Sequence, residues 1–372
     1  MQGNFKGKIY FYCLPQGPLR RAGYQHAIVC LAEGFKELGI DFCSNVNYWK
    51  TSAGNDDYLF KHNPGVAPDD CSVVMLDSAT VDSDGTLPKD LFHPKRRYIT
   101  VYMDSSDGRK THSWRPEFRS FDFIFKTHHN ERCRYPSNIH PWAFGLSERI
   151  IDATSVTPAF KDRRRSVLVN FRVTLPVRMA AKEKFLPHLQ DILPLDNTID
   201  PYDLQTSSQY EHVQYYQTGG RHDPRYYKRL RESIACCCFG GIFIPPWPRD
   251  QAARPLFWHR ILNKLQGGPM RILQWDSFRF WESLAAGCIA FHLDFEKYAF
   301  CMPVMPKNWK HYIGIDMENP QEAAERIADS FKDLERISTE GKAWALENYG
   351  PVPAALRLLN TIYNPPALAR RT

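Results

Sequence analysis

Short apolar segments that end in polar residues recur along the first part of the chain, and few folds accommodate this pattern. The first segment, Lys8 to Cys13, leads through a loop into a predicted helix that stops at Gly39. Further apolar segments are 71–77, 96–104 and 121–128. This alternation predicts an α/β fold with a parallel sheet, in which the carboxyl ends of the strands meet a ligand crevice.

The same alternation begins again in the second half. The stretch 147–165 is polar, contains a proline and a charge cluster, and is the predicted linker. A length of 372 residues suits two domains. The elements predicted after the linker are strand 166–172, helix 178–190, segment 224–241, strand 271–275 and strand 288–295. We therefore expect two Rossmann-like domains, 1–155 and 156–345, facing a central cleft, with a C-terminal helix, 346–372, that crosses back to the first.

The composition excludes several classes of protein. No apolar run approaches the roughly 20 residues that span a bilayer, and no apolar signal region begins the chain, which predicts a cytoplasmic protein. The run Cys236 to Cys238 cannot pair internally, so the ten cysteines are expected to be reduced. Neither these cysteines nor the segment 128–133 has the spacing of a zinc site, and no metal is expected. A net charge of +7 suits an anionic ligand.

The segment 276–295, DSFRFWESLAAGCIAFHLDF, places the acid Glu282 inside an apolar helix that runs into a buried strand. Ser277 is a suitable N-cap, so the free N–H groups of the first helical turn would favour a phosphate there. One turn further, the Glu282 carboxylate could accept hydrogen bonds from two ribose hydroxyls. The simpler alternative is an ion pair between Glu282 and Arg279, three residues away.

This segment resembles the nucleotide-sugar motif of the GT-B glycosyltransferases, in the form S-x-R-x-x-E-x-L-x-x-G-C-I of exostosin-like enzymes, and glycosyltransferase family 1 is similar. The matching residues are Ser277, Arg279, Glu282, Leu284, Gly287, Cys288 and Ile289. The resemblance extends to RRAGYQHAIVCLAEGFKELG near the start, VLVNFR after the linker and the C-terminal tail. It implies the GT-B fold, an acceptor-binding first domain, a nucleotide-sugar-binding second domain and a ribose-binding Glu282. Two departures, Gln274 at the place of a second acid and a single Gly23 in the first loop, favour inversion over retention.

An inverting transfer needs a general base and donors that stabilise the leaving diphosphate, and both can be supplied without a metal. The candidate bases are Asp107, Asp104 and His26, with Asp107 first because Gly108 beside it allows close backbone approach. The predicted donor-binding residues are Glu282, Ser277, Arg279, Arg172, Phe278 and Gly241, and Gly23 and Tyr24 are placed in the acceptor-side loop. No cofactor is expected beyond the nucleotide sugar as co-substrate.

The resemblance implies transfer of a sugar to a hydroxyl acceptor such as a glycan, a lipid-linked glycan or a small metabolite. Three alternatives remain open. A phage-type DNA base glycosyltransferase would use the basic stretches 96–100, 108–119 and 131–135, and its affinity would fall with salt. A non-catalytic nucleotide-sugar-binding module, or an epimerase acting on the donor alone, would leave no transfer to an acceptor.

Overall fold

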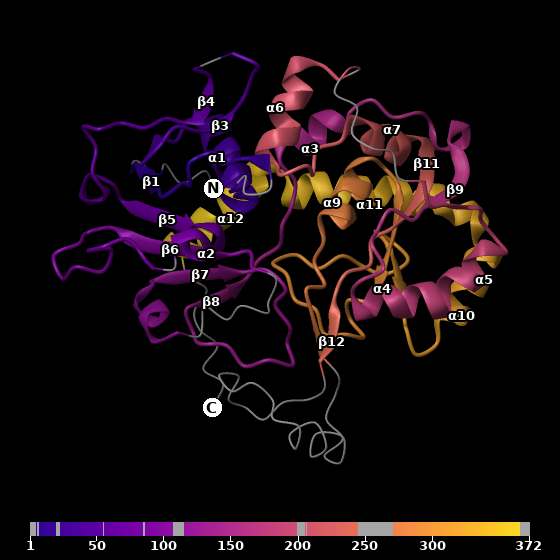
Figure 1. The fold of residues 1–372 in the computed structure, drawn as a ribbon. Helices are drawn as coiled ribbons and strands as arrows, with labels where there is room; N and C mark the ends of the chain where they lie inside the picture. Colours follow the sequence, from indigo (N-terminus) through magenta and orange to yellow (C-terminus); the bar gives the residue numbers. More distant parts are fainter. Residues whose placement is uncertain are drawn as a thin grey trace.

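Two parallel sheets form the centres of the two halves of the chain (Figure 1). The computed structural model describes Phe5 and residues 7–19, 23–54, 56–84, 86–106, 115–198, 205, 207–244 and 271–364. The first sheet has the order β2-β1-β5-β6-β7-β8. Its strands are β1 (Ile9–Phe11), β2 (Phe42–Ser44), β5 (Val73–Asp77), β6 (Ile99–Asp104), β7 (Phe123–Lys126) and β8 (Ile139–Pro141), all paired in parallel. Their continuous apolar sequences fit strands that are buried on both faces.

The first sheet is accompanied by the predicted helix α1 (His26–Glu37), whose apolar positions are buried. Gly39 follows it with φ of 69°, a left-handed conformation that favours glycine. The other elements of this half are the hairpin β3 (Tyr48–Lys50) and β4 (Tyr58–Phe60) and the helix α2 (Ser78–Asp84).

The second sheet has the order β10-β9-β11-β14-β15, again all parallel. Its strands are β9 (Arg164–Leu168), β10 (Leu195–Asp196), β11 (Ser233–Cys237), β14 (Ile289–Leu293) and β15 (Ile313–Ile315). The helices of this half are α4 (Pro176–Ala180), α5 (Leu186–Gln190), α6 (Gln209–Gln217), α7 (Pro224–Glu232), α9 (Phe278–Ala285), α10 (Pro320–Asp329) and α11 (Leu334–Tyr349).

Three sequence-based predictions need correction here. The predicted strand 271–275 is outside the parallel sheet: β13 (Arg271–Leu273) forms an antiparallel hairpin with β12 (Ile242–Ile244) and ends before Gln274, which has φ of 57°. The predicted helix 178–190 contains a π-helical turn, Ala181–Phe185, just before Pro187, which has no N–H to continue the α-helical pattern. The predicted polar linker contains the helix α3 (Glu148–Ala153), where Arg149 and Ile150 are buried.

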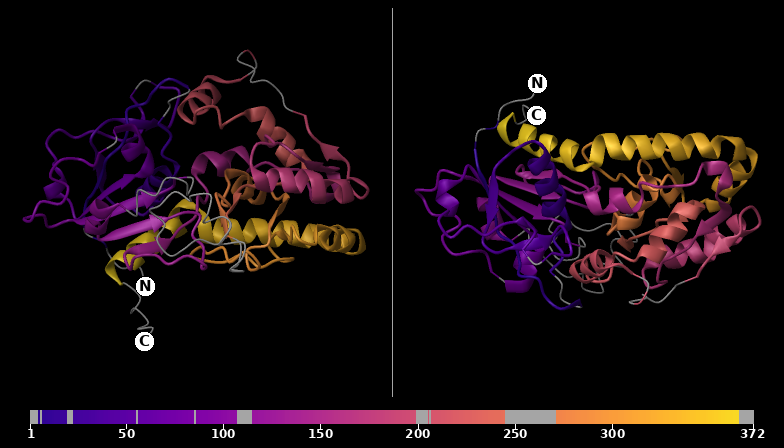
Figure 2. Two further views of the ribbon diagram at one scale, coloured as in Figure 1. Left: turned by 60° about the horizontal axis from the view of Figure 1, so that its bottom comes forward. Right: turned by 90° about the horizontal axis from the view of Figure 1, so that it is seen from above.

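The C-terminal helices run across both halves. In the right-hand view of Figure 2, α11 and α12 (Pro351–Tyr363) follow one another along one side of the molecule. The apolar face of α12 belongs to the core around α1. The two helices approach closely at Gly34, where an added Cβ would lie 2.2 Å from the Pro351 carbonyl oxygen. In the part of the chain that the structure describes, no helix is both long and apolar enough to cross a membrane.

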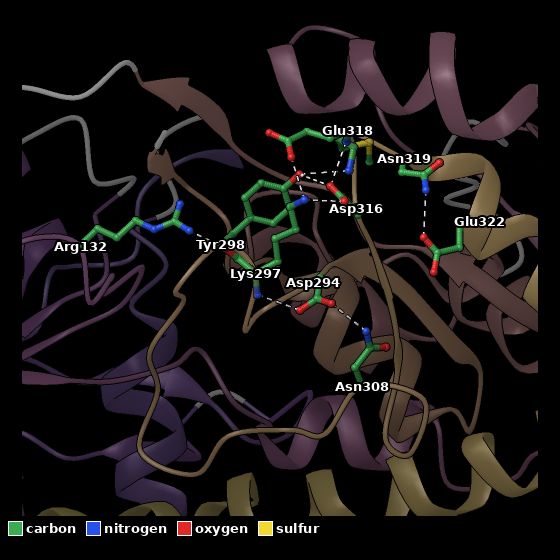
Figure 3. A network of polar contacts seen from close by, with 10 residues as sticks. Arg132, Asp294, Lys297, Tyr298, Asn308, Asp316, Glu318, Asn319 and Glu322 are labelled. Atoms are coloured by element: carbon green, nitrogen blue, oxygen red, sulfur yellow. Dashed lines mark hydrogen bonds and ion pairs between the residues drawn. The ribbon is translucent and has the colours of Figure 1, made fainter. Parts of the chain in front are cut away.

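A second junction between the halves lies beyond β7. The segment around Asn130 pairs with the loop after β14, where the Asn130 side chain donates to the Tyr298 carbonyl (2.9 Å). Figure 3 shows the neighbouring contact, in which Arg132 donates to the Lys297 carbonyl. This loop is braced within its own half, because the Lys297 ammonium lies 2.5 Å from Asp316 and 2.7 Å from Glu318. The halves are therefore joined by the C-terminal helices and by this segment.

Candidate functional site

The order of the second sheet reverses between β9 and β11, and ligands in open α/β sheets bind at such a point. The chain after β9 carries Arg172, and the chain after β11 carries Gly240 and Gly241. Gly241 has φ of 122°, and an added Cβ would lie 2.7 Å from Ile272. Only glycine fits this turn. The turn places the backbone at the point where the strand order reverses, and it is there that Gly241 was predicted to line the donor site.

The predicted helix start at Ser277 lies beside this turn. The Ser277 hydroxyl accepts from the Phe280 N–H (3.4 Å) and donates to the Cys238 carbonyl at the end of β11 (3.0 Å). The N-cap thus attaches the start of α9 to the switch point. The first turn of α9 contains no acid, so its positive end is available to an anion.

Three arginines, Arg172, Arg178 and Arg279, gather at this helix start. Burial, together with the charges of Arg279 and Arg172, lowers the pKa of Arg178 to about 10. None of the three has a carboxylate partner within the described ranges. Arg178 donates to the carbonyls of Phe239 (2.9 Å) and Arg172 (3.3 Å), and the buried Nε of Arg279 has no hydrogen-bond partner in the described residues. Such a group of like charges is more stable with an anion bound, and planar guanidinium groups suit phosphate.

Glu282 is buried in α9, with 4% of its surface exposed. Its carboxylate accepts hydrogen bonds from the hydroxyls of Tyr226 (3.1 Å) and Tyr227 (2.8 Å), at the start of α7. The alternative of an ion pair with Arg279 is not what the structure shows. The two tyrosines instead hold the carboxylate in one orientation, leaving further lone pairs on each oxygen.

Arg149 connects this acid to the first half of the chain. Its guanidinium donates to the Tyr227 hydroxyl (2.8 Å), to His222 (3.0 Å) and to the Tyr24 hydroxyl (3.3 Å). Burial lowers the pKa of Arg149, but the oxygens of Tyr227, Tyr24 and Glu282 raise it overall, so the group is charged. The predicted acceptor-side residue Tyr24 and the predicted donor-side residue Glu282 therefore belong to one network.

Aromatic side chains from both halves of the chain pack against one another beside this network. Phe278, the first residue of α9, stacks on Phe144 with ring centroids 4.5 Å apart and meets the edge of His26 at 4.8 Å. Tyr24 stacks between Trp49 (5.4 Å) and Phe278 (6.1 Å). Phe278, Tyr24 and His26, predicted separately from the sequence, are brought together here.

The candidate bases differ in their surroundings. His26 is buried. The Tyr24 hydroxyl lies 2.6 Å from its Nδ1, and the Gly145 carbonyl lies 3.3 Å from its Nε2. Asp104 is fully buried and paired with Lys126 at 2.7 Å. Asp107 lies outside the described residues. Gly23 has φ of 65°, and its carbonyl accepts from Tyr48 at 3.0 Å, which fixes the loop before α1.

The start of α9 is also anchored to the first half through Asp276. Its carboxylate accepts from the Phe144 N–H and from the Trp281 indole, each at 2.8 Å, and its own N–H donates to Nδ1 of His128 (3.0 Å). Burial raises the pKa of Asp276 to about 7. Burial and the Lys126 charge lower the pKa of His128 to about 3.

We expect the His128→Asn variant to lose less stability than the unsubstituted chain between pH 6.5 and 4. His128 is neutral when folded, and the unfolded chain takes up a proton below pH 6.5, so acidification favours unfolding by about 1.4 kcal/mol per pH unit. Asn tolerates the φ of 55° at this position and keeps an acceptor for Asp276. Urea unfolding at several pH values measures the slope. The same substitution at the exposed His188 is the control, and equal slopes in all three chains would contradict the prediction.

Several of these residues were not predicted. The hydrogen bonds and charge of the site come from Tyr226, Tyr227, Arg149 and Arg178. Of these, only the two adjacent tyrosines at a helix start form a local sequence pattern that could have indicated a site. Within the described part of the chain, no group of three or more His, Cys, Asp or Glu residues is placed to hold a metal ion.

Comparisons with known proteins identify the architecture. No family model and no curated protein sequence matches the chain. Among solved structures, an alpha-glucosyltransferase in complex with UDP-glucose and DNA containing an abasic site is 11% identical, with a TM-score of 0.55, over 96% of this chain and 99% of that one. An alpha-glucosyltransferase in complex with UDP is 10% identical, with a TM-score of 0.53, over 96% and 100%. HepE of Anabaena, in complex with UDP and glucose, is 10% identical with a TM-score of 0.46 over 96% and 100%. The first two likenesses, at full coverage, confirm the predicted GT-B fold.

Proposed function

We propose that this GT-B chain is a glycosyltransferase that moves a sugar from a nucleoside-diphosphate sugar, most simply a UDP-sugar, to a hydroxyl acceptor. One observation carries the proposal: a buried acid, Glu282, lies in the helix whose start is close to three arginines that have no carboxylate partner in the described residues, at the switch point of the second sheet. That spacing suits a nucleotide, with ribose at the acid and diphosphate at the cations.

The proposed donor contacts follow from the chemistry of each group. Glu282 would accept from the ribose hydroxyls, oriented by Tyr226 and Tyr227. Arg279, Arg178 and Arg172 would hold the diphosphate and stabilise the charge that develops on it as the sugar departs. Three cations at a helix start can do this without a metal ion, as the neighbours' UDP and UDP-glucose complexes suggest for the donor class.

The acceptor would bind in the first half, as a glycan, a lipid-linked glycan or a small metabolite. A general base needs a free lone pair near the acceptor hydroxyl. Both ring nitrogens of His26 are engaged and Asp104 is paired with Lys126, which supports neither as the base in this arrangement. We keep Asp107 as the proposed base on the sequence argument.

A DNA base as acceptor is the second candidate, because the alpha-glucosyltransferase neighbours include complexes with DNA. Two of the cations that would serve it already have carboxylate partners. Arg96 is bound by both oxygens of Asp122 (2.7 and 3.2 Å), and Arg115 lies 3.8 Å from Glu117. This neutralisation favours a smaller acceptor. Binding of duplex DNA that weakens steeply with salt would favour DNA instead.

Thermal unfolding against UDP-, GDP-, TDP- and CMP-sugars tests the proposal. A ligand at about 100 times its dissociation constant should stabilise the chain by roughly 2.7 kcal/mol. We expect the UDP-sugars to raise the melting temperature and Glu282→Ala to abolish the response. A folded chain that responds to none of the donors would contradict the proposal. Donor binding without sugar transfer or donor hydrolysis would instead indicate a binding module, and conversion of the donor alone an epimerase.

A further inference from the structure

The hydrogen bonds around Arg149 have a fixed direction. A guanidinium can only donate, so the hydroxyls of Tyr227 and Tyr24 must each accept from it. Each hydroxyl then has one proton left to give. The Tyr227 proton is directed to Glu282 (2.8 Å), and the Tyr24 proton to Nδ1 of His26 (2.6 Å). One buried cation thus sets the proton direction in two arms that end on opposite halves of the chain.

The far end of the second arm agrees with this direction. The Gly145 carbonyl, 3.3 Å from Nε2 of His26, can only accept, which favours the ring proton on Nε2 and leaves Nδ1 as the acceptor for Tyr24. The Cys30 sulfur, 3.4 Å from Nε2, is a weak acceptor that is compatible with this proton. The proton direction set by Arg149 and the acceptor at Gly145 thus favour the same tautomer of His26.

We propose that Arg149 is a positioning residue that couples Glu282 to His26, so that nucleotide bound at Glu282 changes the hydrogen bonding of His26 in the acceptor half. The proposal rests on the function proposed above and adds to it a route between the two half-sites.

The physical basis is competition for one guanidinium. Ribose hydroxyls that donate to Glu282 would weaken it as the acceptor for Tyr227, and the change passes to the bond between Tyr227 and Arg149 because linked hydrogen bonds polarise one another. The Nε of Arg149 is buried without a partner in the described structure, so the guanidinium is held by Tyr227, His222 and Tyr24. The nitrogen that donates to Tyr227 also donates to His222, so a weaker bond to Tyr227 leaves the group held by His222 and Tyr24. The bond from Tyr24 to His26 would then strengthen.

A purely structural role for Arg149 predicts something different. The matched case is Arg163, whose guanidinium donates to the Ala286 and Gly287 carbonyls at the other end of α9 and contacts no ionisable group of the site in the described residues. Loss of Arg163 should lower stability without reaching His26. The variants Arg149→Met, Tyr227→Phe and Arg163→Met, all in the full chain, separate the two roles.

The first experiment uses no ligand. The ring resonances of His26 are recorded by NMR on histidine-labelled protein and assigned by their loss in His26→Asn. We expect Tyr227→Phe, which does not touch His26, to shift them, Arg149→Met to shift them further, and Arg163→Met to leave them unchanged. A His26 spectrum that is the same in Tyr227→Phe and the unsubstituted chain would overturn the coupling, whatever the chain binds.

The second experiment adds UDP. We expect UDP to shift the His26 resonances, Arg149→Met to abolish that response, and the dissociation constant of UDP to rise roughly tenfold in this variant, the effect of one charge-assisted hydrogen bond. UDP binding without any response at His26 would overturn the inference and leave the proposed function standing. Absence of UDP binding would overturn the proposed function, and the ligand-free experiment alone would then decide whether Tyr227 and His26 are coupled.

Discussion

Replacing Glu282 by glutamine is expected to reduce the affinity of the chain for UDP by roughly 100-fold while the protein remains folded. Glutamine has the same shape, keeps one acceptor oxygen for Tyr227 or Tyr226, and its amide can donate to the other hydroxyl. It lacks the charge and the second acceptor that two ribose hydroxyls would use. A hydrogen bond to a charged group contributes about 1.5–3 kcal/mol, and about 3 kcal/mol corresponds to that loss of affinity. Isothermal titration with UDP measures it.

The matched control is Glu33→Gln. Glu33 is also a buried glutamate in a helix, but it accepts from the Glu148 N–H (2.8 Å) and touches none of the proposed donor residues. Burial raises its pKa well above the usual range. We expect this variant to keep the UDP affinity of the unsubstituted chain. Equal affinity in both variants would show that Glu282 is a structural acid held by its two tyrosines.

The fold and the centre of the candidate site were predictable because their signals are local. The unit from Ser277 to Leu293 contains an N-cap, apolar positions at helical spacing and a buried strand within one short segment, and the structure forms α9 and β14 there. The recurrence of such units predicted two parallel sheets. The GT-B resemblance added the pairing of those sheets into one architecture, which the likeness to solved structures confirms.

What escaped prediction depends on contacts between distant residues. Arg149 looked like part of a polar linker because its partners, Tyr24 and Tyr227, are 125 and 78 residues away. The strand at 271 was assigned to the wrong sheet because an apolar segment does not specify its partner, and β13 pairs with β12 instead of with a strand of the parallel sheet. No pattern in the sequence places Arg178 beside Arg279, since their proximity follows from the turn at Gly241.

The Arg279→Met variant should change stability and ligand binding in opposite directions. In the free protein, Arg279 lies near Arg178 and Arg172 without a carboxylate partner in the described structure, so its removal relieves repulsion. Because this region is partly exposed to solvent, the free energy of unfolding should rise by at most about 1 kcal/mol. The affinity for UDP should fall roughly 30- to 100-fold, since a charge-assisted bond to the diphosphate is lost. Urea unfolding and UDP titration on the same sample measure the two effects.

An arginine that already has a carboxylate partner should behave differently. Arg229 in α7 lies 3.1 Å from Asp196, so Arg229→Met should lower stability and leave the UDP affinity unchanged. Repulsion among cations that have no carboxylate partner destabilises the free chain, and a bound anion relieves it, so the sign of the stability change is more informative than its size. If Arg279→Met instead destabilised the free chain and bound UDP normally, the three arginines would have a structural role and the diphosphate would have to bind elsewhere.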